Sequence, residues 1–294
     1  MLIRLCHIWV MDVHVINCET EWEALADRVL APLPQRWLYG EAARRVGREV
    51  RRLCISDRAH PVALAQVVMR PLLAWRISLT SRGPLFLRPC DRQAAVTALR
   101  RALPAGVKLM SPEDRLGRLR LSAPPEVAEL DLTPPVSALR AGLDGKWRNA
   151  LKKAENTRRE PVQTRPSAQT LMPLLHAEKR RQAAGRYRAL PPEFTLAIQK
   201  VAPDSLRLFS GPDAQMLFIR HGTSATYHIG HSGPEGRRLN AHNLLLWNAI
   251  EALRAEGVLR LDLGTIDRDR APTLARFKLR SGAQARRLGP AGLL

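Results

Sequence analysis

The 294-residue sequence predicts an α+β protein in which helices flank mixed central sheets. Two observations lead to this prediction. Residues 223–282 have the pattern of a strand, a long amphipathic helix, a second strand and a short helix, and residues 16–122 show a related succession of helices and strands. A strand, a crossover helix and a second strand form a βαβ unit with parallel strands. Ligands of such sheets bind where neighbouring strands part.

The order of elements is clearest near the C-terminus. Residues 225–230 alternate as a strand that Gly230 closes, and a polar loop over residues 232–238 follows. A helix is then predicted from apolar residues at three- and four-residue steps, namely Leu244, Leu245, Trp247, Ile250 and Leu253. Gly257 suits the left-handed position after this helix. A strand over residues 258–264, a loop and a short helix with Leu274, Phe277 and Leu279 complete the unit.

The first 130 residues show a similar succession of helices and strands. We predict a helix with Thr20 as its N-cap, a break at residues 32–34 and a second helix that ends near Gly47. Further elements are expected as three strands over residues 50–56, 62–70 and 75–80, a helix over 93–103, and weaker strands over 108–110 and 118–122. The N-terminal half therefore looks like a diverged copy of the C-terminal fold, although no sequence repeat links them.

Between the halves, residues 137–156 are predicted to form one helix with an apolar face and a basic face. The basic face carries Lys146, Arg148, Lys152 and Lys153, which suit phosphate contacts, although a solvated surface is the more common role for any one of them. Two more helices over residues 171–186 and 192–201 and a hairpin over residues 206–220 follow.

Composition narrows the class of protein. Lys and Arg number 47 against 27 Asp and Glu, and the net charge of +20 favours polyanionic partners, although an arginine-rich composition alone explains part of it. The four cysteines lack paired CxxC spacing, so we predict no metal site and buried free thiols in a reducing cytoplasm. No membrane span or signal peptide is predicted. Met11 is a possible start, with residues 1–10 disordered.

Three segments carry a resemblance to a known family. The runs ATYHIGHS, NAHNLLLWNAIEALRAEGVLRLDLGTID and LARFKLRSG, together with LDLTPPVSALRAGLDGKWRNALKKAEN upstream, resemble the Fem family of aminoacyl transferases within the GNAT-like superfamily. The match covers residues 130–285 well and residues 35–85 loosely. It implies two tandem GNAT-like domains without a coiled-coil insertion. The expected boundaries are residues 1–130 and 161–294, joined by a basic helix at 131–160.

The resemblance also implies functional residues. Lys278 matches the lysine of the family's Phe-Lys pair at the catalytic site, where a cation stabilises negative charge during acyl transfer, and Phe277 packs beneath it. Trp37 and Arg36 match the portion that binds the acceptor, and Arg82 belongs to a similar Gly-Pro turn. A solvated lysine and a core tryptophan are the alternative interpretations.

Position in the predicted sheet adds further candidates. Asp262 ends a strand and Asp267 lies in the loop after it, where a carboxylate either polarises an amine or holds the loop. Tyr227 and His228 point to opposite faces of one strand, so one of them faces the site. Tyr227 is expected to donate to a carbonyl, whereas His228 is either a base or a satisfied core residue.

One absence bears on the donor. GNAT enzymes that use acetyl-CoA hold its pyrophosphate with a glycine-containing loop before the long helix. Residues 236–241 read Gly-Arg-Arg-Leu-Asn-Ala here, with the small residues out of register, which disfavours CoA. Arg237 and Arg238 remain candidates for phosphate contacts.

The expected function is therefore transfer of an aminoacyl group from aminoacyl-tRNA to an amine of a peptide or peptidoglycan precursor, including a UDP-linked one. Two alternatives stay open: an N-acyltransferase that uses acyl-CoA or a carrier-protein thioester, and an RNA-binding protein with an inactive transferase fold. We expect no tightly bound cofactor, tRNA as a partner, a monomer and a cytoplasmic location.

Overall fold

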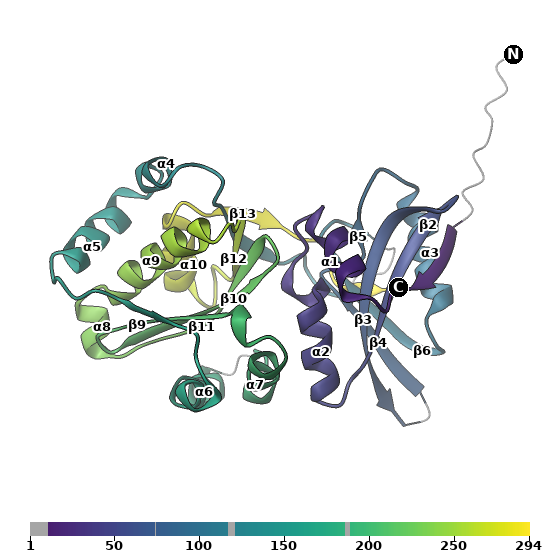
Figure 1. Ribbon diagram of the computed structural model, residues 1–294, viewed down its shortest axis with the longest axis horizontal. Coiled ribbons are helices and arrows are strands. Elements are labelled where there is room, and N and C mark those ends of the chain that lie inside the picture. Colours follow the sequence, from purple (N-terminus) through teal and green to yellow (C-terminus); the bar gives the residue numbers. More distant parts are fainter. Residues whose placement is uncertain (1–10, 74, 117–120, 186–188) are drawn as a thin grey trace, which may run out of the picture. The chain divides into compact units, whose positions relative to one another are not determined.

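The computed structural model describes residues 11–73, 75–116, 121–185 and 189–294 and has a mixed α+β architecture, as predicted (Figure 1). The chain divides into two compact units. The first comprises Met1–Gly40, Gly47–Pro124 and Leu288–Leu294, and the second comprises Glu41–Val46 and Pro125–Arg287. Each unit is built on its own seven-stranded sheet. No helix in the described ranges is both long and apolar enough to cross a membrane.

The first sheet has the strand order β1-β2-β3-β4-β6-β14, with β5 beside β3. Its elements, with the neighbouring helices, are β1 (Met11–Val15), α1 (Glu19–Asp27), the 3₁₀ helix η1 (Leu33–Gln35), α2 (Trp37–Arg45), β2 (Glu49–Asp57), β3 (His60–Leu72), β4 (Trp75–Ser81), β5 (Leu85–Phe86), α3 (Arg92–Ala102), β6 (Gly106–Ser111) and β14 (Gly292–Leu293).

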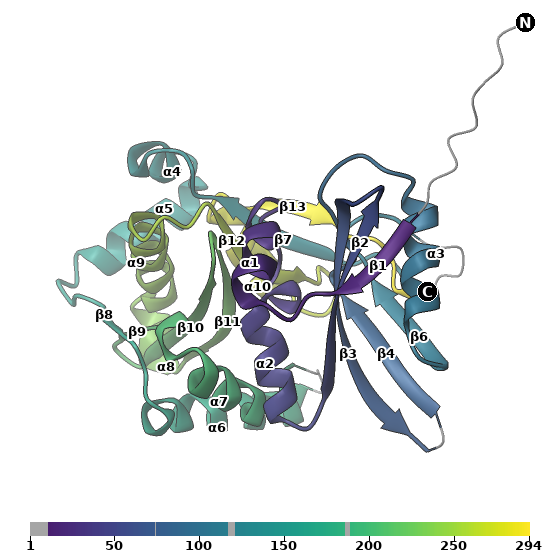
Figure 2. The ribbon, with the colours of Figure 1, turned by 45° about the vertical axis from the view of Figure 1, so that its right-hand side comes forward.

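Alternating side chains divide the first core between the two faces of this sheet. On one face, Ala65 and Met69 of β3 pack in a cluster with Leu99 of α3. On the other, Leu64 of β3 packs with Trp22 of α1. Figure 2 shows α3 on the opposite face of the sheet from α1.

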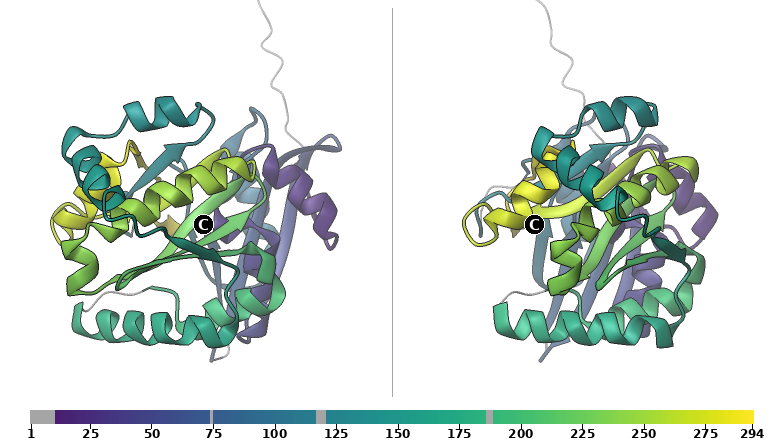
Figure 3. Two further views of the ribbon diagram at one scale, coloured as in Figure 1. Left: turned by 60° about the vertical axis from the view of Figure 1, so that its left-hand side comes forward. Right: turned by 90° about the vertical axis from the view of Figure 1, so that its left-hand side faces the viewer.

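The second sheet has the order β13-β7-β12-β11-β10-β9-β8. Its elements are β7 (Glu126–Asp131), α4 (Val136–Ala141), α5 (Gly145–Glu155), β8 (Val162–Thr164), α6 (Ala168–Gly185), α7 (Pro192–Val201), η2 (Pro203–Ser205), β9 (Leu206–Gly211), β10 (Ala214–His221), β11 (Ser224–Ser232), α8 (Pro234–Arg238), α9 (Ala241–Ala255), β12 (Arg260–Ile266), α10 (Pro272–Arg280) and β13 (Gln284–Arg287). Helices α6 and α7 lie on one face of this sheet, while α5 and α9 lie on the other (Figure 3).

The two units repeat one topology. Three antiparallel strands, a helix and a parallel strand follow each other as β2-β3-β4, α3 and β6 in the first unit and as β9-β10-β11, α9 and β12 in the second. The next position in each sheet is filled by an antiparallel strand from elsewhere in the chain, β14 beside β6 and β7 beside β12. The expected repetition of the fold is thus present despite the absence of a sequence repeat.

Local capping corrects several sequence predictions. The helix expected over residues 137–156 is two helices. The first, α4, ends at Ala141 with Gly142 as its C-cap. Asp144 is the N-cap of α5, and its Oδ1 accepts hydrogen bonds from Lys146 N and Trp147 N. The loop expected over residues 232–238 contains α8. Cys18, not Thr20, occupies the N-cap of α1.

The strand predicted over residues 118–122 lies largely outside the described residues, and the described part, residues 121–122, is not a strand.

The division into units also differs from the expected domain boundaries. The helices of the proposed connecting segment, α4 and α5, belong to the second unit. The C-terminal residues from Leu288 return to the first unit, where β14 pairs with β6.

A buried amide pair holds the first unit together. Gln35 Nε2 donates to the carbonyl oxygens of Gln66 (3.1 Å) and Ser81 (2.7 Å), and Gln35 Oε1 accepts from Gln66 N at 2.7 Å. Both glutamines are at most 1% exposed. The Gln66 amide in turn donates to the carbonyls of Pro34 and Arg36. This network supplies partners to backbone groups that water cannot reach.

Replacement of Gln35 is expected to destabilise the protein strongly. Gln35→Ala leaves three buried backbone partners unsatisfied and opens a cavity, so the free energy of unfolding should fall by about 3 kcal/mol. Urea denaturation measures this change. Gln93→Ala, at an exposed position of α3, is the matched control, and a similar small change in both variants would contradict the assignment.

Candidate active site

The site begins where β11 and β12 stop pairing. These parallel strands pair only through Ser224–Arg260, Ala225–Leu261 and Thr226–Asp262, although β11 continues to Ser232 and β12 to Ile266. In the first unit, β4 and β6 pair over six positions, from Arg76–Gly106 to Ser81–Ser111. Among the described residues, this early divergence therefore distinguishes the second unit, and it removes the sheet partners of backbone groups along two facing strand edges.

Irregularities in both strands produce the divergence. The pairing of β10 with β11 shifts between Leu217 and Phe218, which makes His228 the extra residue of a β-bulge. The pairing of β12 with β7 shifts between Asp262 and Thr265. Asp262 Oδ1 accepts a hydrogen bond from Gly264 N at 2.6 Å, and Gly264 has a φ of +78°. Asp262 thus holds the bend of β12, a structural role, and is 5% exposed.

Lys278 extends from α10 to this bend. Its Nζ donates to Thr265 O at 2.8 Å and lies 5.9 Å from the ring centroid of Tyr227 on β11. Lys278 is 6% exposed. Burial lowers its pKa to about 8, and the Asp262 carboxylate opposes part of this shift. The ammonium group of Lys278 therefore lies between the two diverging strands, and it loses its proton at a lower pH than the ammonium group of an exposed lysine.

Tyr227 and Phe277 line the same side. The Tyr227 ring packs 5.5 Å from Phe218, and a side chain at Gly230 would displace the Tyr227 hydroxyl group. Phe277 lies between Trp147 of α5 and His242 of α9, with ring centroids 6.0 and 6.2 Å away. The structure thus places Tyr227 and Asp262 near Lys278, whereas Phe277 packs between Trp147 and His242. The catalytic and binding roles expected of these residues stay predictions.

His228 faces the other side of the sheet, opposite to Tyr227 as predicted. Its Nε2 hydrogen-bonds Thr195 Oγ1 of α7 at 2.7 Å. Burial lowers the pKa of His228 to about 4, against a smaller opposing effect of Glu178. The ring is therefore neutral at physiological pH, and the Thr195 contact favours the core interpretation over the role of a base.

Several polar groups at this strand were not singled out from the sequence. Arg181 of α6 donates to Gly230 O at 2.6 Å and forms an ion pair with buried Glu178. His242 Nε2 lies 2.9 Å from His231 O, and burial lowers the pKa of His242. No periodic pattern marks these residues, because their importance comes from contacts with a bulged strand distant in sequence.

Other candidates lie apart from Lys278. Asp267 Oδ1 accepts from the backbone of Asp269 and Arg270, which shapes the loop before α10. Arg237 donates to Ser232 O, and Arg238 makes two hydrogen bonds to Glu235 within α8.

On α5, Arg148 Nη2 donates to the carbonyls of Ala141 and Leu143, both at 2.8 Å. It thereby satisfies carbonyls at the end of α4. Lys146, Lys152 and Lys153 are exposed, so a phosphate-binding role stays a prediction for these lysines.

The candidates of the first unit have local partners. Arg36 is fully buried and pairs with Glu23 at 2.8 Å and Asp27 at 2.7 Å, which explains it as a structural residue. The Arg52 guanidinium stacks 3.4 Å from the ring centroid of half-buried Trp37. Arg82 pairs with Glu113. Acceptor binding by Trp37 and Arg82 stays a prediction.

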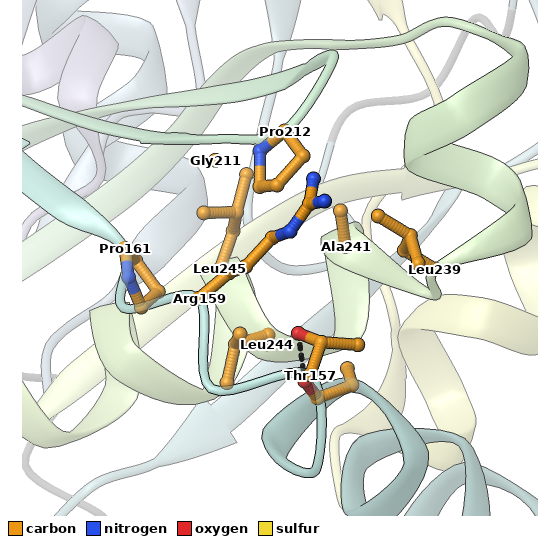
Figure 4. A pocket seen from close by; sticks show the side chains of 10 residues that line it. Thr157, Arg159, Pro161, Gly211, Pro212, Leu239, Ala241, Leu244 and Leu245 are labelled. Carbon is orange, nitrogen blue, oxygen red and sulfur yellow. Dashed lines mark hydrogen bonds between the residues drawn. The ribbon is translucent and has the colours of Figure 1, made fainter.

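Two hollows lie near α9. One is bordered by Arg159, Pro212 and Ala241, and Figure 4 shows the Arg159 guanidinium reaching between Pro212 and Ala241. The second, about 230 Å³, is polar and lined by residues that include Arg140, Trp247 and Glu251. Neither hollow is lined by Lys278 or Tyr227. Among the described residues, no group of three or more His, Cys, Asp or Glu is placed to hold a metal ion.

Comparison with known families agrees with this geometry. Residues 140–278 match the family described as "Acetyltransferase (GNAT) domain", a segment that runs from α4 to Lys278. The segment that matches this GNAT domain lies within the second unit. This match indicates an acyltransferase. No curated protein matches the sequence.

Solved structures support the tandem fold. The structure of FemX is similar over 96% of both chains, with 14% identity and a TM-score of 0.76. A tandem GNAT protein from the clavulanic acid biosynthesis pathway shares 10% identity over 97% of both chains, with a TM-score of 0.50. The C-terminal domain of a putative lysylphosphatidylglycerol synthetase from Agrobacterium fabrum shares 15% identity, covers 94% of this chain and 92% of its own, and has a TM-score of 0.51. The expected two GNAT-like units are confirmed, and the described elements include no coiled-coil insertion.

Burial of His228 predicts a stability loss on acidification. Between pH 6.5 and about 4, His228 binds a proton in the unfolded chain but not in the folded protein. The free energy of unfolding therefore decreases by up to about 3 kcal/mol as the pH is lowered through this range. His228→Gln, which removes the titrating group, should show a correspondingly smaller fall in urea denaturation over this range. The exposed His176, replaced by Gln, is the control and should behave as the wild type.

Proposed function

We propose that this protein transfers an aminoacyl group from aminoacyl-tRNA to an amine of a peptide or peptidoglycan precursor. The observation that carries the proposal is Lys278, a buried ammonium group beside the diverging edges of β11 and β12. A buried cation in a region of low dielectric interacts strongly with negative charge that develops during acyl transfer. Tyr227, which borders the same side, is a further donor for a carbonyl oxygen.

The proposed reaction needs no metal or redox partner. The acceptor amine attacks the ester carbonyl, a C–N bond forms, and negative charge moves to the carbonyl oxygen, which Lys278 stabilises. Collapse of this intermediate breaks the C–O ester bond. The amine gives up its proton, and the departing tRNA hydroxyl group takes one up, so charge and atoms balance. One hydrogen on Lys278 Nζ is committed to Thr265 O, which fixes the direction of the group.

The proposed donor fits the basic character of the second unit. Arg159 lies beside Ala241 in the first turn of α9, where the helix dipole favours a phosphate, and Asn240 makes no side-chain cap there. Lys152 and Lys153 are exposed on α5. The net charge of +20 supports a polyanionic donor. The name of lysylphosphatidylglycerol synthetase, which shares the fold, supports an aminoacyl group as the cargo.

Acyl-CoA is the second candidate donor, because the matching family is described as an acetyltransferase domain. Helix α8 weighs against it. Residues 234–238, which precede α9, form a helix in which Arg238 is engaged by Glu235, instead of a glycine-rich phosphate loop. For the acceptor, the Fem-type fold supports a peptide or a UDP-linked peptidoglycan precursor bound by a monomer in the cytoplasm.

Loss of the Lys278 charge is expected to abolish transfer. Lys278→Met keeps the apolar stem but removes the cation, so kcat should fall by about 10²- to 10³-fold, while tRNA binding persists. The measurement is transfer of label from aminoacyl-tRNA to cell-wall precursors, with acetyl-CoA reactions in parallel. The exposed Lys200, replaced by Met, is the matched control.

Each alternative has a distinct result in the same assay. Label transfer from acetyl-CoA alone would establish the second donor. Tight RNA binding without transfer from either donor, unchanged in Lys278→Met, would indicate an inactive transferase that binds RNA. Full activity of Lys278→Met would contradict the role of this lysine.

The pH dependence separates two roles of Lys278. If the ammonium stabilises the oxyanion, kcat/KM falls about tenfold per pH unit above the lysine pKa of about 8. If the free amine acted as a base, kcat/KM would instead rise through this pH. Lys278→Arg keeps the charge, and any residual activity of this variant should lose the alkaline fall.

A further inference from the structure

The end of the first sheet where β3 leads into β4 exposes large apolar side chains. Leu72 and Trp75 face each other across the two strands and are 44% and 62% exposed. Leu73 is 97% exposed. Val107 of β6, which pairs with Ile77 of β4, is 40% exposed. We call Leu72, Leu73, Trp75 and Val107 the apolar tip. Figure 2 shows the long hairpin of β3 and β4 that carries it.

Basic residues surround the apolar tip within the same unit. Arg70 lies two residues before Leu72, and Arg48 precedes Glu49, whose partner across the sheet is Met69. Arg76 pairs in register with Gly106, which brings the C-terminal end of α3, with Arg100 and Arg101, to the same end of the sheet. All five arginines are exposed. Of the neighbouring carboxylates, Glu49 pairs with Arg76.

This combination fits one kind of partner. A tryptophan with adjacent leucines suits the boundary between headgroups and acyl chains, where its ring is apolar and its N–H stays hydrated. Arginines around such a tip meet the phosphates of anionic lipids, and each contributes through the negative surface potential. A protein partner would require a shaped apolar surface, whereas the tip projects single side chains among charges. A helical span is not needed for such an attachment.

We propose that the apolar tip and its arginines dock this protein on the surface of an anionic lipid bilayer. Trp75 and Leu73 enter the interfacial region, and Arg48, Arg70, Arg100 and Arg101 contact lipid phosphates. This inference concerns the first unit and does not depend on the proposed transferase reaction in the second. Its failure would therefore leave the proposed function untouched.

The test is sedimentation of the full chain with vesicles at low ionic strength. Binding is expected to vesicles of phosphatidylcholine with phosphatidylglycerol and not to phosphatidylcholine alone. The double variant Leu73→Ser and Trp75→Ser should lower the partition coefficient by at least about tenfold. Arg48→Gln and Arg70→Gln should each lower it by about fivefold. In wild type, brominated lipids should quench tryptophan fluorescence, and Trp75→Phe should remove most of this quenching.

Matched variants within the first unit control for general effects. Val15→Ser removes an apolar side chain that is 51% exposed on β1, and Arg28→Gln with Arg58→Gln removes charge elsewhere. These variants should bind vesicles like the wild type, apart from a small common loss from net charge. Absence of binding to anionic vesicles, or equal loss in the controls and the tip variants, would overturn the proposal. A dimer that Leu73→Ser and Trp75→Ser convert to a monomer, without vesicle binding, would assign the tip to self-association.

Discussion

The candidate site depends on one constraint: two parallel strands pair for only three residues and are then kept apart. Asp262 holds the bend of β12 by accepting from Gly264 N, and the bulge at His228 displaces β11. On the far face, Thr195 and Arg181 hold the bulged strand at His228 and Gly230. Without these contacts the strands could continue to pair, and their backbone edges would be consumed by the sheet.

Lys278 gains its chemistry from the same constraint. The bend exposes Thr265 O to its Nζ, so an ammonium group can be buried with a fixed orientation. Desolvation lowers the lysine pKa, while Asp262 keeps the charged form accessible. One carboxylate therefore shapes the strand and also moderates the charge beside it. The position and the pKa of Lys278 therefore both depend on Asp262.

The two units share a topology but differ in how their parallel strands pair and where their buried polar groups lie. In the first, β4 and β6 pair along their length, and a buried network around Gln35 and Gln66 stabilises the sheet instead of opening it. In the second, buried Glu178 and half-buried His228 lie at the diverging strand. One topology thus contains an uninterrupted pair of parallel strands in the first unit and a diverging pair in the second.

The sequence by itself determined the α+β class and most element positions, because periodicity and local motifs encode these features. Lys278 and Phe277 were singled out by the resemblance to the Fem family, and Tyr227 and Asp262 by their places on predicted strands; the catalytic roles of these residues are a proposal. The sequence did not reveal Arg181 or His242, the burial of Arg36, or the division of residues 137–156 at Asp144. Those depend on which distant groups meet: Arg36 with Glu23, and Arg181 with Gly230 O. Burial and pKa are properties of three-dimensional packing, so only the tertiary structure decided that His228 is neutral and Lys278 is a perturbed cation.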